Sequence, residues 1–201
     1  LVNDLAAPIE ELRRTVIGQT SVFLVGDRAA CRAMECTLGN LITDAMREAT
    51  GAQIAITNGG GIRASIPNTP TPEDVALPSP IDVTLGDVLT VLPFGNLVST
   101  FSLTGADVIA ALEHGLSALG TDAGTGRFPQ VSGLRFTFDI TQPVGSRIVS
   151  VEVEGEDGSF SPIDPEAIYY VASIDFMRNG GDGYTMFEDN AINPYDFGSP
   201  L

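Results

Sequence analysis

A short glycine-rich segment carries residue types suited to binding a small anionic ligand. Residues 58–63 (NGGGIR) place three consecutive glycines between an asparagine and an arginine, directly after the apolar run QIAIT. Glycines expose backbone N–H groups without side chains in the way, and a forked guanidinium pairs well with phosphate. Taken alone, the segment also fits a purely structural turn, so the sequence leaves a turn and an anion site open.

Two further segments also fit either a ligand-binding role or a purely structural one. Residues 179–184 (NGGDGY) follow a β-branched and aromatic run that ends at Asp175 and Phe176. Residues 92–96 (LPFGN) place Phe94 between a proline and a glycine, which offer the ring little packing. For residues 179–184 the structural alternative is a tight turn, and for Phe94 it is packing in the protein core.

The sequence contains segments suited to ligand binding but no pattern typical of catalytic or metal-binding residues. His114 is the only histidine, and it lies in the run DVIAALEHGL, where a position on the helix surface or in its C-terminal turn accounts for it. The acidic residues form no D-x-H or H-x-x-x-H pattern, and no G-x-S-x-G elbow is present. Cys31, Cys36 and His114 are too few for a four-ligand zinc site. We therefore expect no catalytic residue, no metal ligand and no cofactor in this chain.

Charge and composition exclude several classes of partner. The formal net charge is -16, and all ten basic residues are arginine. Such a charge repels nucleic acid, while the absence of lysine excludes a Walker P-loop, a Schiff-base lysine and a polybasic membrane patch. No stretch approaches the roughly 20 apolar residues of a membrane span, and residues 1–16 lack the features of a signal peptide. We expect the chain to begin inside a longer protein.

The elements that must position these segments alternate irregularly between strands and helices. Residues 1–19 are expected to form a helical interdomain connector, and residues 20–201 one domain. The patterns predict strands at 20–25, 53–57, 97–103, 131–140, 147–153 and 168–174, and helices at 37–50, 86–91 and 105–119. Residues 65–80 are predicted to be an irregular loop and 120–126 a flexible one. The fold class is therefore α+β, with a mixed, mainly antiparallel sheet covered by helices.

Five motifs, in order, resemble the C-terminal domain of the 5'-nucleotidases, a group that includes UDP-sugar hydrolases and 2',3'-cyclic-nucleotide phosphodiesterases. The resemblance runs from about residue 20 to residue 189. Its motifs are CRAMEC with LGNL (31–36 and 38–41), NGGGIR (58–63), LPFG (92–95), FPQVSGL (128–134) and FMRNGGDGY (176–184).

The resemblance assigns a role to each matching position. It implies that Phe94 and Phe176 sandwich the nucleobase. It implies that Arg32 and Arg63 reach ribose and phosphate. Asn58 and Asp182 would contact base and ribose hydroxyls, and Gly60 and Gly61 would let the backbone approach closely. Met34 stands where some members carry a second arginine.

The resemblance also bears on the two cysteines, for which spacing alone leaves a disulfide or two buried thiols open. It implies a Cys31–Cys36 disulfide, and with it an extracellular or periplasmic location.

The function implied is substrate recognition in a metal-dependent 5'-nucleotidase that hydrolyses nucleoside 5'-monophosphates. Two divalent metal ions would belong to an N-terminal metallophosphoesterase domain of the same chain, which this sequence lacks, so we expect this domain alone to be inactive. The alternatives are a domain of a UDP-sugar hydrolase or 2',3'-cyclic-nucleotide phosphodiesterase, or a stand-alone nucleoside-binding module without catalysis.

Overall fold

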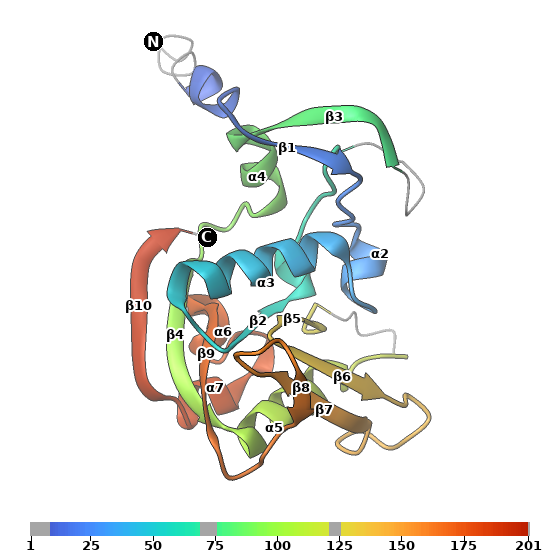
Figure 1. Ribbon diagram of the computed structural model, residues 1–201, viewed down its shortest axis with the longest axis vertical. Coiled ribbons are helices and arrows are strands. Elements are labelled where there is room, and N and C mark those ends of the chain that lie inside the picture. The colour runs from blue at the N-terminus through green and yellow to red at the C-terminus, as the bar shows by residue number, and fades with distance from the viewer. Residues whose placement is uncertain (1–8, 69–75, 121–125, 201) are drawn as a thin grey trace.

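The protein is described by a computed structural model covering residues 9–68, 76–120 and 126–200. Within these ranges the strands form a two-stranded, a five-stranded and a three-stranded sheet (Figure 1). The strands are β1 Val16–Val22, β2 Ile54–Asn58, β3 Ala76–Thr84, β4 Leu97–Thr104, β5 Pro129–Ser132, β6 Leu134–Phe138, β7 Ile148–Glu154, β8 Phe160–Pro162, β9 Ile168–Ile174 and β10 Ile192–Pro200. The helices are α2 Arg28–Cys31, α3 Thr37–Thr50, α4 Leu85–Val91, α5 Gly105–Leu116, α6 Asp175–Arg178 and α7 Thr185–Asp189, with short 3-10 turns η1 Gly59–Gly61 and η2 Gly181–Gly183.

The five-stranded sheet is the centre of the fold. Its strand order is β10-β4-β9-β2-β5, with β2 and β9 parallel and the other neighbours antiparallel. All five residues of β2 are buried, which explains its continuous apolar run. Helix α3 packs against β2, β5 and β9, and α5 packs against β4 and β5. The predicted α+β class with a mixed, mainly antiparallel sheet is confirmed.

Helix α3 lies where its sequence pattern predicted it. Leu38, Ile42 and Met46 recur every fourth residue and are buried. The helix ends at Gly51, which adopts the left-handed conformation with φ 69° and donates its N–H to the Arg47 carbonyl. This helix separates the central sheet from a lobe made of β1, β3 and α4 (Figure 1).

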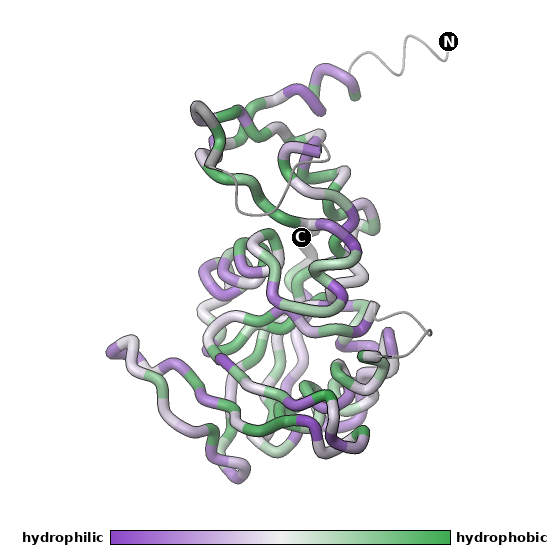
Figure 2. The backbone as a smooth tube through the Cα atoms, turned by 90° about the vertical axis from the view of Figure 1, so that its right-hand side faces the viewer, coloured by the Kyte–Doolittle hydropathy of each residue, from purple (hydrophilic) through white to green (hydrophobic). Residues whose placement is uncertain are grey.

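Hydrophobic residues concentrate in the strands at the centre of the body, whereas the outer turns are mostly hydrophilic (Figure 2). The three-stranded sheet has the order β6-β7-β8 and packs beside the central one through the β5–β6 junction. No helix of the described ranges is both long and apolar enough to cross a membrane.

Several predicted boundaries were wrong. The strand predicted at 20–25 is β1, which begins at Val16 inside the expected connector, because its pairing with β3 extends that far. The predicted 65–80 loop gives way to β3 from Ala76. The strand predicted at 131–140 is divided at Gly133, whose φ of 75° sends β5 and β6 into different sheets. Helix α5 ends at Leu116 instead of residue 119.

Some elements were missed, and some predictions cannot be compared. The short elements α6, α7 and β8 span too few residues to show a period, and β10 contains proline and glycine, as an edge strand tolerates. The connector helix is present at residues 9–13. Residues 1–8 of the connector, 69–75 of the first loop and 121–125 of the second lie outside the described residues.

Candidate functional site

A cavity of about 490 Å³ forms where several strand and helix ends meet. Such a volume is typical of small-molecule sites. All eight residues predicted to bind ligand line it: Arg32, Asn58, Gly60, Gly61, Arg63, Phe94, Phe176 and Asp182. The fold thus brings together residues from segments that are far apart in the chain.

Two further cavity residues, Asn96 and Gly126, were not singled out from the sequence. Asn96 follows the Phe94 turn directly, so the LPFGN segment contained the signal for it. Gly126 gave no such signal, because its approach to Gly60 depends on the tertiary fold.

Two phenylalanines present exposed rings to the cavity. Phe94, in the turn after α4, is 60% exposed, and Phe176, in α6, is 44% exposed. The Arg63 guanidinium lies 5.6 Å from the centre of the Phe94 ring. Gly181 allows the Phe176 ring to lie close, because a Cβ there would approach the ring carbons to 2.6 Å. These two faces are suited to stacking on a planar group.

A hydrogen-bonded pair, Asn58 and Asp182, lies in the same cavity. Asn58 is 4% exposed, and its Nδ2 donates to Asp182 Oδ2 at 2.5 Å. Among the described residues Asn58 Oδ1 is buried without a hydrogen-bond partner. Buried acceptors are normally satisfied, so an unpaired amide oxygen is unusual at this position.

Asp182 is held in an unusual backbone conformation, with φ 54°. Aspartate tolerates this region better than most residues, at a cost of roughly 1–3 kcal/mol. The ring of His114, in the last turn of α5, hydrogen-bonds the Asp182 carbonyl at 2.9 Å through Nε2. His114 lies in the C-terminal turn, as its sequence context suggested, and supports the loop that carries Asp182.

The arginines give the cavity a local positive charge in a strongly acidic protein. Burial lowers the pKa of Arg32 below its ordinary value, and the positive charges of Arg28 and Arg63 lower it further, while Asp182 opposes them. Within the described part of the chain, the buried Arg32 Nε has no hydrogen-bond partner. Arg63 donates to the Gly60 carbonyl at 3.2 Å. Clustered guanidinium groups with donors to spare favour a bound anion.

The sequence left a structural turn and an anion site open for the glycines of η1. The N–H groups of Gly59 and Gly60 are used within the protein: Gly59 donates to the Phe128 carbonyl at 2.8 Å and Gly60 to the Gly126 carbonyl at 2.7 Å. These glycines are needed for close packing instead. A Cβ at Gly59 would overlap the Cys31 carbonyl oxygen, and one at Gly60 would lie 2.8 Å from the Gly126 oxygen.

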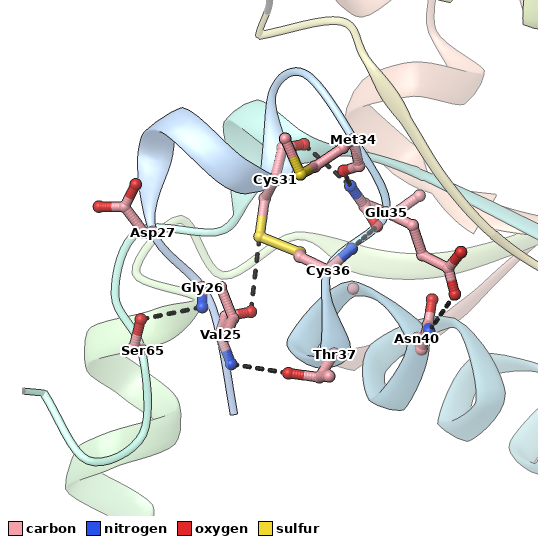
Figure 3. The surroundings of a disulfide bond; sticks show 12 residues. Val25, Gly26, Asp27, Cys31, Met34, Glu35, Cys36, Thr37, Asn40 and Ser65 are labelled. Atoms are coloured by element: carbon pink, nitrogen blue, oxygen red, sulfur yellow. Dashed lines mark hydrogen bonds between the residues drawn. A yellow bond between two sulfur atoms is a disulfide. The ribbon is translucent and has the colours of Figure 1, made fainter. Parts of the chain in front are cut away.

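The predicted Cys31–Cys36 disulfide is confirmed (Figure 3). Its Cα atoms are 5.2 Å apart, and both cysteines are buried. Flanking hydrogen bonds fix the chain that enters and leaves this loop, from Val25 N to Thr37 Oγ1 at 2.7 Å and from Gly26 N to Ser65 Oγ at 2.9 Å. The loop between the cysteines carries Arg32 to the cavity.

The described residues do not fit a metal centre. In those ranges no three His, Cys, Asp or Glu side chains gather closely enough to hold a metal ion.

Two aromatic faces, an arginine cluster and a buried amide–carboxylate pair have the chemistry suited to a planar ligand that bears both polar groups and negative charge. The chain belongs to the family described as 5'-nucleotidase, C-terminal domain, which it matches over residues 16–189. The family resemblance found in the sequence is confirmed.

Similar proteins support this membership. The trifunctional nucleotide phosphoesterase protein YfkN of Bacillus subtilis is 41% identical, over 90% of this chain and 12% of its own length. A snake venom 5'-nucleotidase of Macrovipera lebetinus is 34% identical, over 96% of this chain and 48% of its own. The crystal structure of a 5'-nucleotidase precursor from Thermus thermophilus has a TM-score of 0.85 and 44% identity, covering 99% of this chain and 37% of that one. This chain therefore spans less than half of each of these relatives.

Proposed function

We propose that this chain is the substrate-recognition domain of a 5'-nucleotidase that hydrolyses nucleoside 5'-monophosphates to nucleoside and phosphate. The observation that carries the proposal is the meeting of all eight predicted binding residues in one cavity of about 490 Å³. The role proposed for each position is the one that its side-chain chemistry suggests.

In the proposed complex, the nucleobase stacks between Phe94 and Phe176. Base stacking on an aromatic face contributes on the order of 1–3 kcal/mol per base and tolerates any base. Asp182 accepts hydrogen bonds from the ribose hydroxyls, since one carboxylate can serve two vicinal donors. Asn58 Oδ1 supplies a further acceptor.

The phosphate group is proposed to bind at Arg32 and Arg63. Both line the cavity, and the Nε of Arg32 is a buried donor without a partner in the described ranges. Charge-assisted hydrogen bonds from guanidinium to phosphate are about twice as strong as neutral ones.

We further propose that hydrolysis takes place on an N-terminal metallophosphoesterase domain of the same chain, carrying two divalent metal ions. The relatives support this division, because this chain spans only 37% of the Thermus protein. The domain boundary at residue 20 belongs to the same proposal: residues 1–19 would lead from the other domain into β1, whose pairing with β3 begins at Val16. An extracellular or periplasmic location is supported by the disulfide and by the venom relative.

UDP-sugars and 2',3'-cyclic nucleotides remain candidate substrates of the longer protein, because two phenylalanine faces stack any base. The YfkN relative, a trifunctional nucleotide phosphoesterase, favours testing them beside AMP. A stand-alone nucleoside-binding module would show the same ligand affinity with no partner domain, and the intact mass of the natural protein separates that case from a longer chain.

Saturation-transfer NMR with adenosine and AMP tests the proposed site. We expect transfer to the base protons with the unaltered chain, and at least tenfold weaker binding of both ligands to Phe176→Ala, because one stacking face is lost. Tyr195→Ala is the matched control, since Tyr195 is an exposed aromatic on β10 that does not line the cavity. If neither ligand shows transfer to the unaltered protein, the proposal is wrong.

A further inference from the structure

One buried side chain connects the central sheet to the loop that carries Arg32. Gln130 lies in β5, opposite Thr57 of β2, and is 1% exposed. Its Nε2 donates to the Cys31 carbonyl at 2.9 Å and to the Met34 carbonyl at 2.8 Å. Its Oε1 accepts from the Cys36 N–H at 3.1 Å. The amide thus uses both donors and one acceptor on a single six-residue loop.

The disulfide alone does not fix this loop in the protein. It joins Cys31 to Cys36 and so closes the loop on itself, whereas the Gln130 amide binds both ends and the middle of the loop to the sheet. One of the bonded groups is the Cys31 carbonyl, which belongs to the peptide bond leading into Arg32. A shift of that peptide would move Arg32 in the cavity.

The Gln130 amide and the loop that it binds are tightly packed against α3 and the η1 turn. A Cβ at Gly39, in α3, would overlap the Gln130 Oε1, and a Cβ at Gly59 would overlap the Cys31 carbonyl oxygen. The loop is therefore packed between the Gln130 amide on one side and the η1 turn on the other. A close-packed interior of this kind transmits displacements to its neighbours.

The segment that contains Gln130 also holds the η1 turn, which precedes Arg63, in place. The Phe128 carbonyl accepts from the Gly59 N–H, and the Gly126 carbonyl accepts from the Gly60 N–H. Arg63 follows that turn and hydrogen-bonds the Gly60 carbonyl. Residues 126–130 therefore set the position of Arg32 relative to Arg63.

We propose that Gln130 is a positioning residue for phosphate recognition, acting through Arg32. The inference rests on the proposed nucleotide-binding function and adds a residue that does not line the ligand cavity. It requires an amide at this position, because the site offers two carbonyls and one N–H. Glutamate would face two carbonyl oxygens with a carboxylate, and methionine would leave all three groups unpaired.

The test compares AMP with adenosine, which differ only in the phosphate. Calorimetric titration of folded Gln130→Met and Gln130→Glu is expected to show AMP affinity reduced about tenfold, with adenosine affinity unchanged within about twofold. In an Arg32→Met background, Gln130→Met should cause no further loss of AMP affinity, because its effect passes through Arg32.

The control is Gln53→Met, at an exposed position outside the cavity. It removes another side-chain amide that is bonded to the sheet, since Gln53 Oε1 accepts from Tyr170 N. It should leave the affinities for AMP and adenosine unchanged. Equal losses for the two ligands in Gln130→Met would mean a general structural role and would overturn the inference. Failure of the unaltered protein to bind either ligand would instead overturn the proposed function and this inference with it.

A second measurement needs no variant. The Gln130 side-chain amide protons of the unaltered protein should exchange slowly with solvent, and their NMR resonances should shift on addition of AMP but not of adenosine. Rapid exchange, or the same shift with both ligands, would contradict the role proposed for Gln130 even if the Gln130 variants did not fold.

Discussion

Asp182 combines a strained backbone with a side chain that faces the ligand cavity. Its φ of 54° is rare for a residue with a side chain, and His114 and Asn58 hydrogen-bond its carbonyl and its carboxylate. Strain of this kind persists where surrounding contacts fix it, often at functional sites. The left-handed conformation turns the carboxylate toward the same cavity as the phenylalanines.

The variant Asp182→Asn removes the side-chain charge and keeps the backbone conformation, so it tests the two features separately. Asparagine tolerates positive φ and keeps the size of the side chain, so we expect thermal stability to change little. The loss of a charged acceptor should weaken adenosine binding about tenfold, whereas 2',3'-dideoxyadenosine should bind both proteins equally. Calorimetry with the two nucleosides measures this difference. An equal loss with both would show that the carboxylate does not read the ribose.

The family resemblance singled out the eight candidate residues, and the fold brings all of them to one cavity. Residue types alone indicated only the segments around Phe94 and Arg63, for which a structural explanation also stayed open. What could not be predicted was the use of the glycine N–H groups, which bond the Phe128 and Gly126 carbonyls. Those partners lie more than sixty residues away in the chain, and no local pattern reports them.

At the scale of elements, the η1 turn is the most constrained part of the site. Gly59→Ala should destabilise the protein by roughly 2–4 kcal/mol, because the new methyl would overlap the Cys31 carbonyl oxygen. For a domain of this size, the expected fall in Tm is about 5–15 °C. Calorimetric or circular-dichroism melting measures it.

Gly18→Ala is the control for that substitution. Gly18 lies in β1, and a Cβ there meets no atom within 4 Å. The same chemical change should therefore leave the Tm within about 2 °C of the original. Equal effects at the two glycines would contradict the packing argument.

The disulfide loop gives a second prediction at this scale. The Cys31→Ala/Cys36→Ala variant should lose about 2 kcal/mol of stability, as the loop between the cysteines is short. Urea unfolding of this variant, beside the oxidised and the reduced forms of the original protein, measures the loss. Reduction should destabilise the original protein and leave the variant unchanged, so an effect of reductant on the variant would point to a different cause.

Elements with a long regular pattern could be predicted, and short or interrupted ones could not. Helix α3 repeats its buried residues over fourteen positions, which leaves little choice of structure. The run from residue 129 to 138 has strand character throughout, yet Gly133, with φ 75°, turns it between two sheets. A Cβ at this position would overlap the Gln53 carbonyl oxygen. That glycine was visible in the sequence, and an isolated glycine in a strand pattern is a known sign of a bend.

On the scale of the whole molecule, the net negative charge of the protein contrasts with the positive charge of the arginines at the cavity. The net charge of -16 repels polyanions, whereas Arg28, Arg32 and Arg63 create a small positive region at the cavity. The positive region is small, so it suits a single phosphate group better than a polyanion. This charge distribution supports the proposed nucleotide ligand over an oligonucleotide.

The proposed separation of substrate recognition from hydrolysis predicts that this chain alone binds AMP without hydrolysing it. Because no cluster of metal-binding side chains occurs in the described residues, AMP should bind this chain equally well in EDTA and in Mn²⁺ or Zn²⁺. Phosphate release from AMP should stay at the level of the protein-free blank in all three conditions, and calorimetry with a phosphate assay measures both quantities. Phosphate release should appear when the chain is joined to the proposed metallophosphoesterase domain, and EDTA should abolish it. Turnover by this chain alone, or an AMP affinity that depends on metal, would place catalytic or metal-binding groups in this domain and contradict the proposed division of labour.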